Sequence, residues 1–127
     1  MKYVIDSYAW VEYLDGSKAG RKVKEILESE SEVYTSAISI AEIVSKAKRS
    51  GADVKVALNA MTILSRIVDI DFNMAKNAGK IHAEMRKKIK DFGLGDCFVL
   101  ECAKRVNGKV VTGDEHFRGM KNVVFIK

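Results

Sequence analysis

Two aspartates follow short runs of β-branched residues and so stand where strands are expected to end. Asp6 closes the run Tyr3–Ile5, and Asp114 follows the run Val110–Thr112 after one glycine. If both runs form central parallel strands, their carboxyl ends lie along one edge of the sheet, where open α/β sheets place their ligands. Asp6 could equally cap the helix that begins next, because an aspartate there can accept a hydrogen bond from a free backbone N–H.

A third carboxylate, that of Asp96, shares one face of a predicted helix with apolar residues. Val99, Leu100 and Ala103 follow it at helical spacing, so Asp96 is expected on the same inward face. A carboxylate on a buried face is costly unless it is paired. The alternative is an acid near a helix N-terminus, where the helix dipole favours negative charge.

Glu42 is the fourth acid of interest, and it lies roughly opposite the apolar stripe of Ile40, Ile43, Val44 and Ala47. Periodicity alone predicts a solvated glutamate. Its helix, however, follows directly on a strand expected beside the first, so its early turns should overhang the same sheet edge. Carboxylates gathered in this way repel one another and acquire raised pKa values unless a cation neutralises them. Mg²⁺ or Mn²⁺, which prefer oxygen ligands, would suit such a set.

Five β-branched runs alternate with helical patterns along the chain. The predicted strands are Tyr3–Ile5, Val33–Thr35, Ile67–Ile70, Val110–Thr112 and Val123–Ile126. Apolar residues at three- and four-residue spacing predict helices between them, and the longest such pattern runs from Met74 to Ile89. The alternation predicts an α/β fold with a central parallel sheet of about five strands flanked by helices. With 127 residues, 47% of them hydrophobic, and no linker or repeat, the chain is expected to form one domain over residues 1–127.

The composition favours an anionic partner without proving one. Lysine and arginine number 22 against 17 acidic residues, for a net charge of +5, which suits nucleic acid, although many soluble proteins are as basic. Cys97 and Cys102 lie in one predicted helix and point in different directions, so we expect core thiols in a reducing compartment. No apolar run reaches the ~20 residues of a membrane helix, and Met1 and Lys2 lead directly into a strand rather than into a signal peptide. We therefore expect a cytoplasmic protein without a membrane segment.

In their order and local contexts, the four acids resemble the motifs of the PIN-domain nucleases, and more narrowly those of the VapC-type toxins of toxin–antitoxin pairs. The contexts are Asp6 in YVIDSYAW, Glu42 in ISIAEIV, Asp96 in LGDCFVLECAKR and Asp114 in VVTGDEHF, with Phe117 three residues after the last acid. The resemblance spans essentially the whole chain. Three glycines depart from the usual pattern: Gly93 where a proline is frequent, Gly95 where alanine is common, and Gly113 where a basic residue is common. The last departure removes a cation that could face a phosphate.

The resemblance implies a Mg²⁺-dependent endoribonuclease, with Mn²⁺ as a possible substitute, acting as the toxin of a VapBC-type pair. It implies that Asp6 and Asp96 bind the metal directly and that Asp114 and Glu42 complete the catalytic set. Glu42 could orient the attacking water. The implied partners are an RNA substrate, a cognate antitoxin protein and a second copy of the chain in a homodimer. Ser7 and Thr112 offer hydroxyls at the same edge, either to hold ligands or water in place or as ordinary cap and strand-end residues.

Other residues have two interpretations each. The candidate phosphate contacts are Lys46, Lys48, Arg49, Arg86, Lys87, Lys88 and Lys90, although a charge run is more often the solvated face of a helix. The aromatic residues Tyr8, Trp10 and Tyr13 could stack an unpaired base, and packing is the more common role. Of the two histidines, His82 is predicted in the core and His116 on the surface, with neither needed for catalysis.

Two alternatives to the nuclease remain. One is a non-catalytic PIN-like module that binds RNA or protein, which the intact acid set argues against. The other is a receiver-like, phosphate-accepting signalling domain, with Asp69 and Asp71 near the end of the third predicted strand. A receiver needs paired acids after the first strand, where only Asp6 is present, and it leaves Glu42 and Asp96 without a role.

Overall fold

Five parallel strands form the central sheet, in the spatial order β3-β2-β1-β4-β5. In the computed structural model, which describes residues 1–127, the strands are β1 (Lys2–Ile5), β2 (Glu32–Ser36), β3 (Arg66–Val68), β4 (Lys109–Thr112) and β5 (Val123–Phe125). The helices are α1 (Ser7–Asp15), α2 (Lys18–Glu28), α3 (Ala37–Ser50), α4 (Val54–Leu64), α5 (Phe72–Met85) and α6 (Leu94–Val106), with a short 3₁₀ helix η1 (Glu115–Phe117). The predicted α/β class and all five predicted strands are confirmed, with strand ends shifted by one or two residues.

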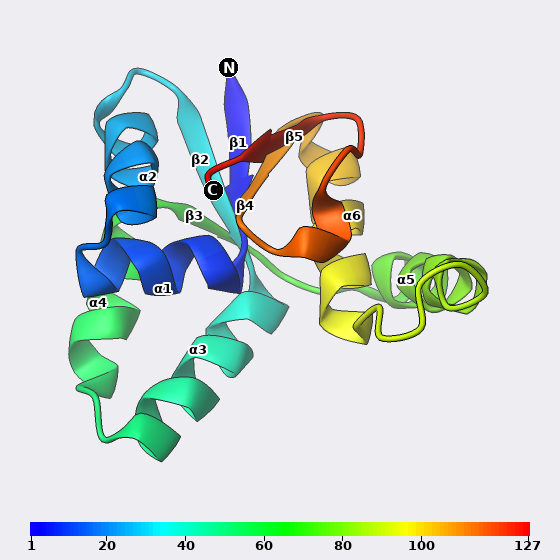
Figure 1. The fold of residues 1–127 in the computed structure, drawn as a ribbon, viewed down its shortest axis with the longest axis horizontal. Coiled ribbons are helices and arrows are strands. Elements are labelled where there is room, and N and C mark those ends of the chain that lie inside the picture. The colour runs from blue at the N-terminus through cyan, green and yellow to red at the C-terminus, as the bar shows by residue number, and fades with distance from the viewer.

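Helices cover both faces of the sheet, as Figure 1 shows. Successive residues of a strand point to opposite faces, so Ile5 and Val111 pack with the apolar residues of α1 to α4. Their neighbours Val4 and Val110 pack on the other face, against α5, α6 and η1. Because the central strands β1 and β4 are buried on both faces, each contains a short apolar run rich in β-branched residues, which is why the sequence pattern located them.

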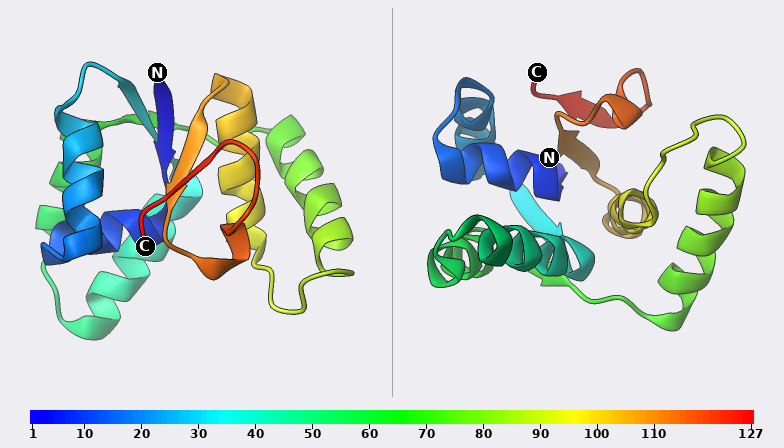
Figure 2. Two further views of the ribbon diagram at one scale, coloured as in Figure 1. Left: turned by 45° about the horizontal axis from the view of Figure 1, so that its top comes forward. Right: turned by 60° about the horizontal axis from the view of Figure 1, so that its bottom comes forward.

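The carboxyl ends of the central strands meet at one edge of the sheet. There β1 leads into α1, β2 leads into α3, and β4 leads into η1. Figure 2 shows these three connections on the same side of the molecule, beside the N-terminal end of α6. This arrangement places the beginnings of four helices around a single edge.

The long helix predicted from Met74 to Ile89 is shorter than expected. Helix α5 ends at Met85, and the chain then turns through Arg86 to Asp91 before α6 begins. Ile89 still packs against the cluster around Phe92, so its apolar spacing reflects packing in the turn rather than another helical turn. The extension to Ile89 was therefore wrong, because residues in a turn can satisfy the same apolar pattern.

Both cysteines are free and buried, as predicted. Burial raises the pKa of each thiol to about 11. His82, expected in the core, is half-buried, with its Nε2 3.1 Å from the carbonyl oxygen of Phe92. No helix combines the length and the apolar character that crossing a membrane requires.

Candidate metal centre

Asp6 ends β1 and caps α1 at the same time. Its Oδ1 accepts a 2.8 Å hydrogen bond from the backbone N–H of Ala9, and the residue is only 3% exposed. Burial raises its pKa to about 7; the charges of Asp96 and Asp114 add to this, and the hydrogen bonds from Thr112 and Ala9 oppose it. The two sequence interpretations of Asp6, a helix cap and a member of an acid cluster, are therefore compatible.

Asp114 approaches the same edge from β4. Its backbone N–H donates a 3.0 Å hydrogen bond to the Thr112 hydroxyl oxygen, and its Oδ1 accepts a 2.9 Å bond from the backbone N–H of His116. These contacts fix the turn between β4 and η1. Thr112 is fully buried and contacts both Asp6 and Asp114, so its hydroxyl positions two of the four acids.

Asp96 comes from the first turn of α6. Its side chain is 21% exposed, at the end of the face that continues inward with Val99 and Ala103. Burial raises its pKa to about 6, and the negative charges of Asp114 and Glu42 contribute further. A carboxylate held near other carboxylates in this way favours a bound cation.

Glu42 reaches the site from the second turn of α3. Its Oε1 accepts a 3.0 Å hydrogen bond from the Ser7 hydroxyl at the start of α1. The residue lies on the solvent-facing rim, yet partial burial of the carboxylate raises its pKa, and the Ser7 bond opposes this shift. Its position follows from the direction in which α3 leaves the sheet, as the sequence predicted.

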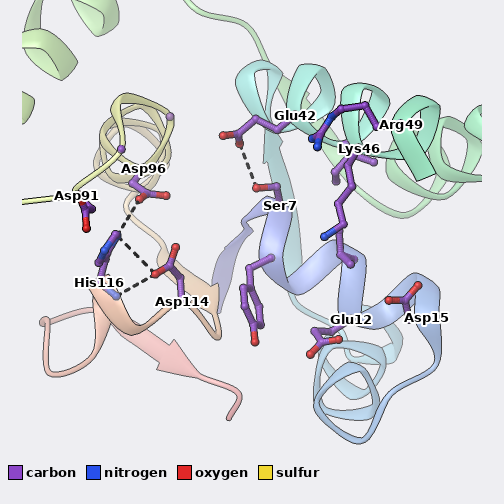
Figure 3. A pocket seen from close by; sticks show the side chains of 15 residues that line it. Ser7, Glu12, Asp15, Glu42, Lys46, Arg49, Asp91, Asp96, Asp114 and His116 are labelled. Atoms are coloured by element: carbon purple, nitrogen blue, oxygen red, sulfur yellow. Dashed lines mark hydrogen bonds and ion pairs between the residues drawn. The ribbon is translucent and has the colours of Figure 1, made fainter. Parts of the chain in front are cut away.

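The acids surround an open pocket of about 640 Å³. In Figure 3, Asp91, Asp96, Asp114 and His116 form one side, and Glu42 and Ser7 project from across the pocket. The remaining labelled residues, Lys46, Arg49, Glu12 and Asp15, line the part away from Asp96 and Asp114. Asp6 is not among the lining residues and lies beneath this surface, buried at the end of β1.

Some of the candidate base-stacking and phosphate-binding residues line the pocket, and the others do not. Trp10 is fully buried, and its indole N–H donates a 3.0 Å hydrogen bond to the Thr35 hydroxyl, so it is a packing residue. Tyr13 is half-buried with its ring edge against Trp10, whereas Tyr8 lines the pocket. Among the basic candidates, only Lys46 and Arg49 line it.

Sequence reasoning missed His116, which was expected on the surface. Its Nδ1 lies 3.7 Å from Oδ2 of Asp96 and 3.6 Å from Oδ1 of Asp114, and its side chain is 31% exposed. Asp91, which also lines the pocket, was missed as well. The spacing of Asp114 and His116, two positions apart just beyond a predicted strand, was the one available signal.

Donor atoms of Asp96, Asp114 and His116 all lie within 4.8 Å of one another, which is close enough for one metal ion. Asp6 stands outside this set, although its pKa responds to the charges of Asp96 and Asp114. Two carboxylates flanked by further acids with raised pKa values are a suitable donor set for a divalent cation. The residues present therefore fit a divalent metal ion.

The family model described as "PIN domain" matches residues 3–123 of the chain. The chain belongs to the PIN domain family. This confirms the resemblance seen in the order of the four acids. A comparison with curated protein sequences finds no match.

Solved structures share the complete PIN domain fold at low sequence identity. A toxin–antitoxin complex from Klebsiella pneumoniae is 18% identical, with a TM-score of 0.74 over 98% of both chains. The Mycobacterium tuberculosis toxin VapC20, described as cleaving the sarcin–ricin loop, is 12% identical, with a TM-score of 0.78 over 95% of this chain and 96% of that one. VapBC2 from Rickettsia felis, solved with a promoter DNA fragment, is 19% identical, with a TM-score of 0.72 over 98% of this chain and 97% of that one.

All three glycines that depart from the usual PIN pattern lie against site residues. A Cβ at Gly93 would lie 3.3 Å from Oδ2 of Asp96. A Cβ at Gly95 would lie 2.5 Å from Oε2 of Glu42, so the glycine allows that carboxylate to approach the start of α6. A Cβ at Gly113 would lie 2.5 Å from the ring of Tyr8. The tyrosine ring therefore occupies the space beside position 113, and the ammonium of Lys127 lies 5.5 Å from the centre of that ring.

The receiver-like alternative does not agree with the structure. Asp71 caps α5 and accepts two hydrogen bonds from the Arg105 guanidinium, at 2.9 and 3.2 Å. These hydrogen bonds lower the pKa of Asp71, and the residue does not line the acidic pocket. It is a structural acid that ties α5 to α6.

Proposed function

We propose that this PIN domain is a metal-dependent endoribonuclease that hydrolyses RNA phosphodiester bonds with Mg²⁺ or Mn²⁺. The observation that carries the proposal is the convergence of Asp6, Glu42, Asp96 and Asp114, from four separate elements, at one sheet edge. Three of these acids have raised pKa values. Such a set is unfavourable in the absence of a cation, so the arrangement is explained by a site built to bind one.

The charge distribution of the pocket supports dependence on a metal. Six acidic residues line it, namely Glu12, Asp15, Glu42, Asp91, Asp96 and Asp114, against the two cations Lys46 and Arg49. An RNA phosphate would be repelled by this surface unless a divalent cation neutralised part of the charge. A bound cation would also supply Lewis-acid chemistry, which makes water more acidic and stabilises negative charge on the leaving oxygen.

Within this proposal each acid has a separate task. Asp6 and Asp96 are the proposed metal ligands, and Asp114 completes the donor set beside Asp96. The Thr112 hydroxyl and the Ala9 N–H hold Asp6 in place. Glu42, at the rim and oriented by Ser7, is the proposed proton acceptor that positions the attacking water, a role for which a raised pKa is suitable.

Lys46 and Arg49 are the proposed contacts for the RNA backbone. They project from α3, one and two helical turns beyond Glu42, into the part of the pocket away from Asp96 and Asp114 (Figure 3). A strand of RNA could thus place one phosphate at the acids while a neighbouring phosphate meets these cations. Contacts of this kind are electrostatic and carry little sequence information.

We further propose that the protein is the toxin of a VapBC-type pair, that residues 1–127 act as one cytoplasmic domain, and that it forms a homodimer. The support for the pairing is that proteins of similar structure, from Klebsiella pneumoniae and Rickettsia felis, were solved as toxin–antitoxin complexes. An apolar groove of about 370 Å³ between α1, α3 and α4 shares four lining residues with the acidic pocket, namely Val11, Asp15, Ile43 and Lys46. A chain segment of the antitoxin bound in that groove would extend directly to the acids.

The test of the nuclease proposal is cleavage of labelled structured and unstructured RNAs with Mg²⁺ or Mn²⁺. EDTA and Asp6→Asn are the parallel controls. Cutting that requires the metal and is lost in both controls is the expected result. If the folded protein binds the metal at these acids and cuts none of the RNAs, the non-catalytic RNA- or protein-binding alternative replaces the proposal.

A further inference from the structure

His116 holds an imidazole nitrogen without a hydrogen-bond partner next to the two closest carboxylates of the site. Its Nδ1 is buried and neither accepts nor donates a hydrogen bond. The same atom lies 3.7 Å from Oδ2 of Asp96 and 3.6 Å from Oδ1 of Asp114. A buried polar atom left unpaired is costly. The position of Nδ1 therefore indicates a bound partner that lies between this nitrogen and the two carboxylate oxygens.

The imidazole is held in position by its surroundings. The backbone N–H of His116 donates to Oδ1 of Asp114 at 2.9 Å, which fixes the start of η1. On its other side the ring packs against Phe92, with ring centres 5.7 Å apart, and Phe92 in turn packs against Phe117 at 6.0 Å. Phe92 and Phe117 are both fully buried. The side chain is therefore fixed by packing against buried aromatic residues rather than free on the surface.

The spacing of the three donors is near that of ligands around one ion. Oxygen and nitrogen ligands lie about 2.1 Å from a small divalent cation, so adjacent ligands of one ion are about 3 Å apart. The distances of 3.6 and 3.7 Å from Nδ1 to the two carboxylates require only a small inward movement to reach this spacing. Nδ1 must then carry no proton, which leaves Nε2 as the protonated nitrogen.

We propose that His116 is a direct nitrogen ligand of the metal held by Asp96 and Asp114, so that the centre is a mixed oxygen and nitrogen site. This inference rests on the metal centre of the proposed function. Mg²⁺ prefers oxygen ligands and retains its waters, whereas imidazole favours transition metals. The His116 ligand therefore biases the site towards Mn²⁺, Co²⁺ and similar ions over Mg²⁺.

The direct test is pulsed EPR of Mn²⁺ bound to the protein, which detects magnetic coupling to a coordinating nitrogen. The chain has two histidines, so His82→Gln is the matched control that leaves His116 as the single imidazole. We expect nitrogen coupling in the wild type and in His82→Gln, and its loss in His116→Gln. Labelling histidine with ¹⁵N should change the signal in both proteins that show it, which excludes a backbone nitrogen.

Metal affinity gives an independent readout that needs no RNA. In His116→Gln we expect Mn²⁺ affinity to fall at least about tenfold, the usual scale for disturbed metal sites, while Mg²⁺ affinity changes much less. Circular dichroism checks that the variant is folded. If it is not, the ¹⁵N-labelled His82→Gln protein still decides the question, because its remaining imidazole is that of His116.

The outcomes separate this inference from the proposed function. Mn²⁺ that binds with no nitrogen coupling, and is lost in Asp96→Asn, would show an all-oxygen centre and overturn the role of His116 alone. In that case the imidazole serves as an ion-pair partner of the two aspartates. Absence of any specific Mn²⁺ or Mg²⁺ binding by the folded wild type would overturn both. RNA cleavage without nitrogen coupling would retain the nuclease and reject the ligand.

Discussion

The hydroxyl of Ser7 donates a 3.0 Å hydrogen bond to Oε1 of Glu42, and this contact joins the first turn of α1 to the second turn of α3. It lowers the pKa of Glu42 against the rise caused by burial. The hydroxyl therefore both orients the proposed proton acceptor and helps to keep it ionised.

Replacing Ser7 by alanine should raise the pKa of Glu42 further, because a hydrogen bond to the charged form is lost. A proton acceptor must be deprotonated to act, so the acidic limb of the pH profile of kcat/KM should move to higher pH. Activity above the acidic limb should also fall several-fold, because the Ser7 hydroxyl no longer orients the carboxylate. The measurement is the pH profile of RNA cleavage, with Ser31→Ala as a control outside the pocket. Superimposable profiles for the wild type and Ser7→Ala would remove the assigned role of Glu42.

Asp6 should make the metal-free protein less stable as pH rises. Its pKa is raised from 3.8 to about 7, so the folded state binds the proton more tightly than the unfolded state does. The resulting stabilisation is present at low pH and is lost between about pH 4 and 7. About two pH units of this window lie between pH 5 and 7, and one unit corresponds to about 1.4 kcal/mol, so the loss from pH 5 to 8 is on the order of 3 kcal/mol.

Asp6→Asn should reduce this pH dependence, because the amide oxygen can still cap α1 while the titrating charge is gone. Asp96, whose pKa is also raised, should leave a smaller residual dependence. Urea unfolding in EDTA at pH 5 and pH 8 measures the effect, and Asp53→Asn, at the exposed cap of α4, is the matched control. An Asp6→Asn protein with the full wild-type slope would contradict the burial of a titrating carboxylate there.

Divalent metal should stabilise the folded protein through the acids of the centre. A ligand that binds only the folded state adds about 2.7 kcal/mol when present at one hundred times its Kd, which corresponds to several degrees in Tm. Thermal melts with and without Mn²⁺ should therefore differ for the wild type and coincide for Asp96→Asn and Asp114→Asn. Asp69→Asn, an exposed acid outside the pocket, should behave as the wild type. Equal metal stabilisation in all four proteins would place the ion elsewhere.

Removing a pocket cation should weaken RNA binding without altering the chemistry. Lys46→Ala or Arg49→Ala each deletes one proposed phosphate contact, so KM should rise while kcat is nearly unchanged. The slope of log affinity against log salt concentration should fall by about 0.7 for single-stranded RNA. Lys48→Ala is a close control, since Lys48 is on the same helix and does not line the pocket. If Lys48→Ala changes the slope as much as the other two, the RNA path differs from the one proposed.

Much of the fold could be predicted because the central strands β1 and β4 are buried on both faces and therefore contain short continuous apolar runs. The four acids could be located because Asp6 and Asp114 follow such runs, and the position of Asp96 on an apolar helical face indicated burial. Glu42 was harder, since periodicity describes only which face of α3 it occupies. Its place in the site depends on the contact with Ser7, 35 residues away in the chain.

His116 and the end of α5 could not be predicted for a shared reason. The environment of His116 is created by Phe92 and Asp96, which belong to a turn and a helix preceding β4. That same turn retains the apolar spacing of α5 and so conceals the helix end at Met85. Periodicity reports local burial, and it carries no information on which distant segment supplies the neighbours.

The double role of Asp6 has an evolutionary consequence. The cap on α1 needs only a side-chain oxygen, whereas the acid cluster needs a negative charge. At position 6, folding therefore requires only a side-chain oxygen, whereas the proposed metal centre requires a carboxylate. If the proposed function holds, a single change to asparagine would yield a descendant with the cap of α1 intact and the proposed metal centre disabled. Fold similarity alone would not distinguish such a descendant from its parent.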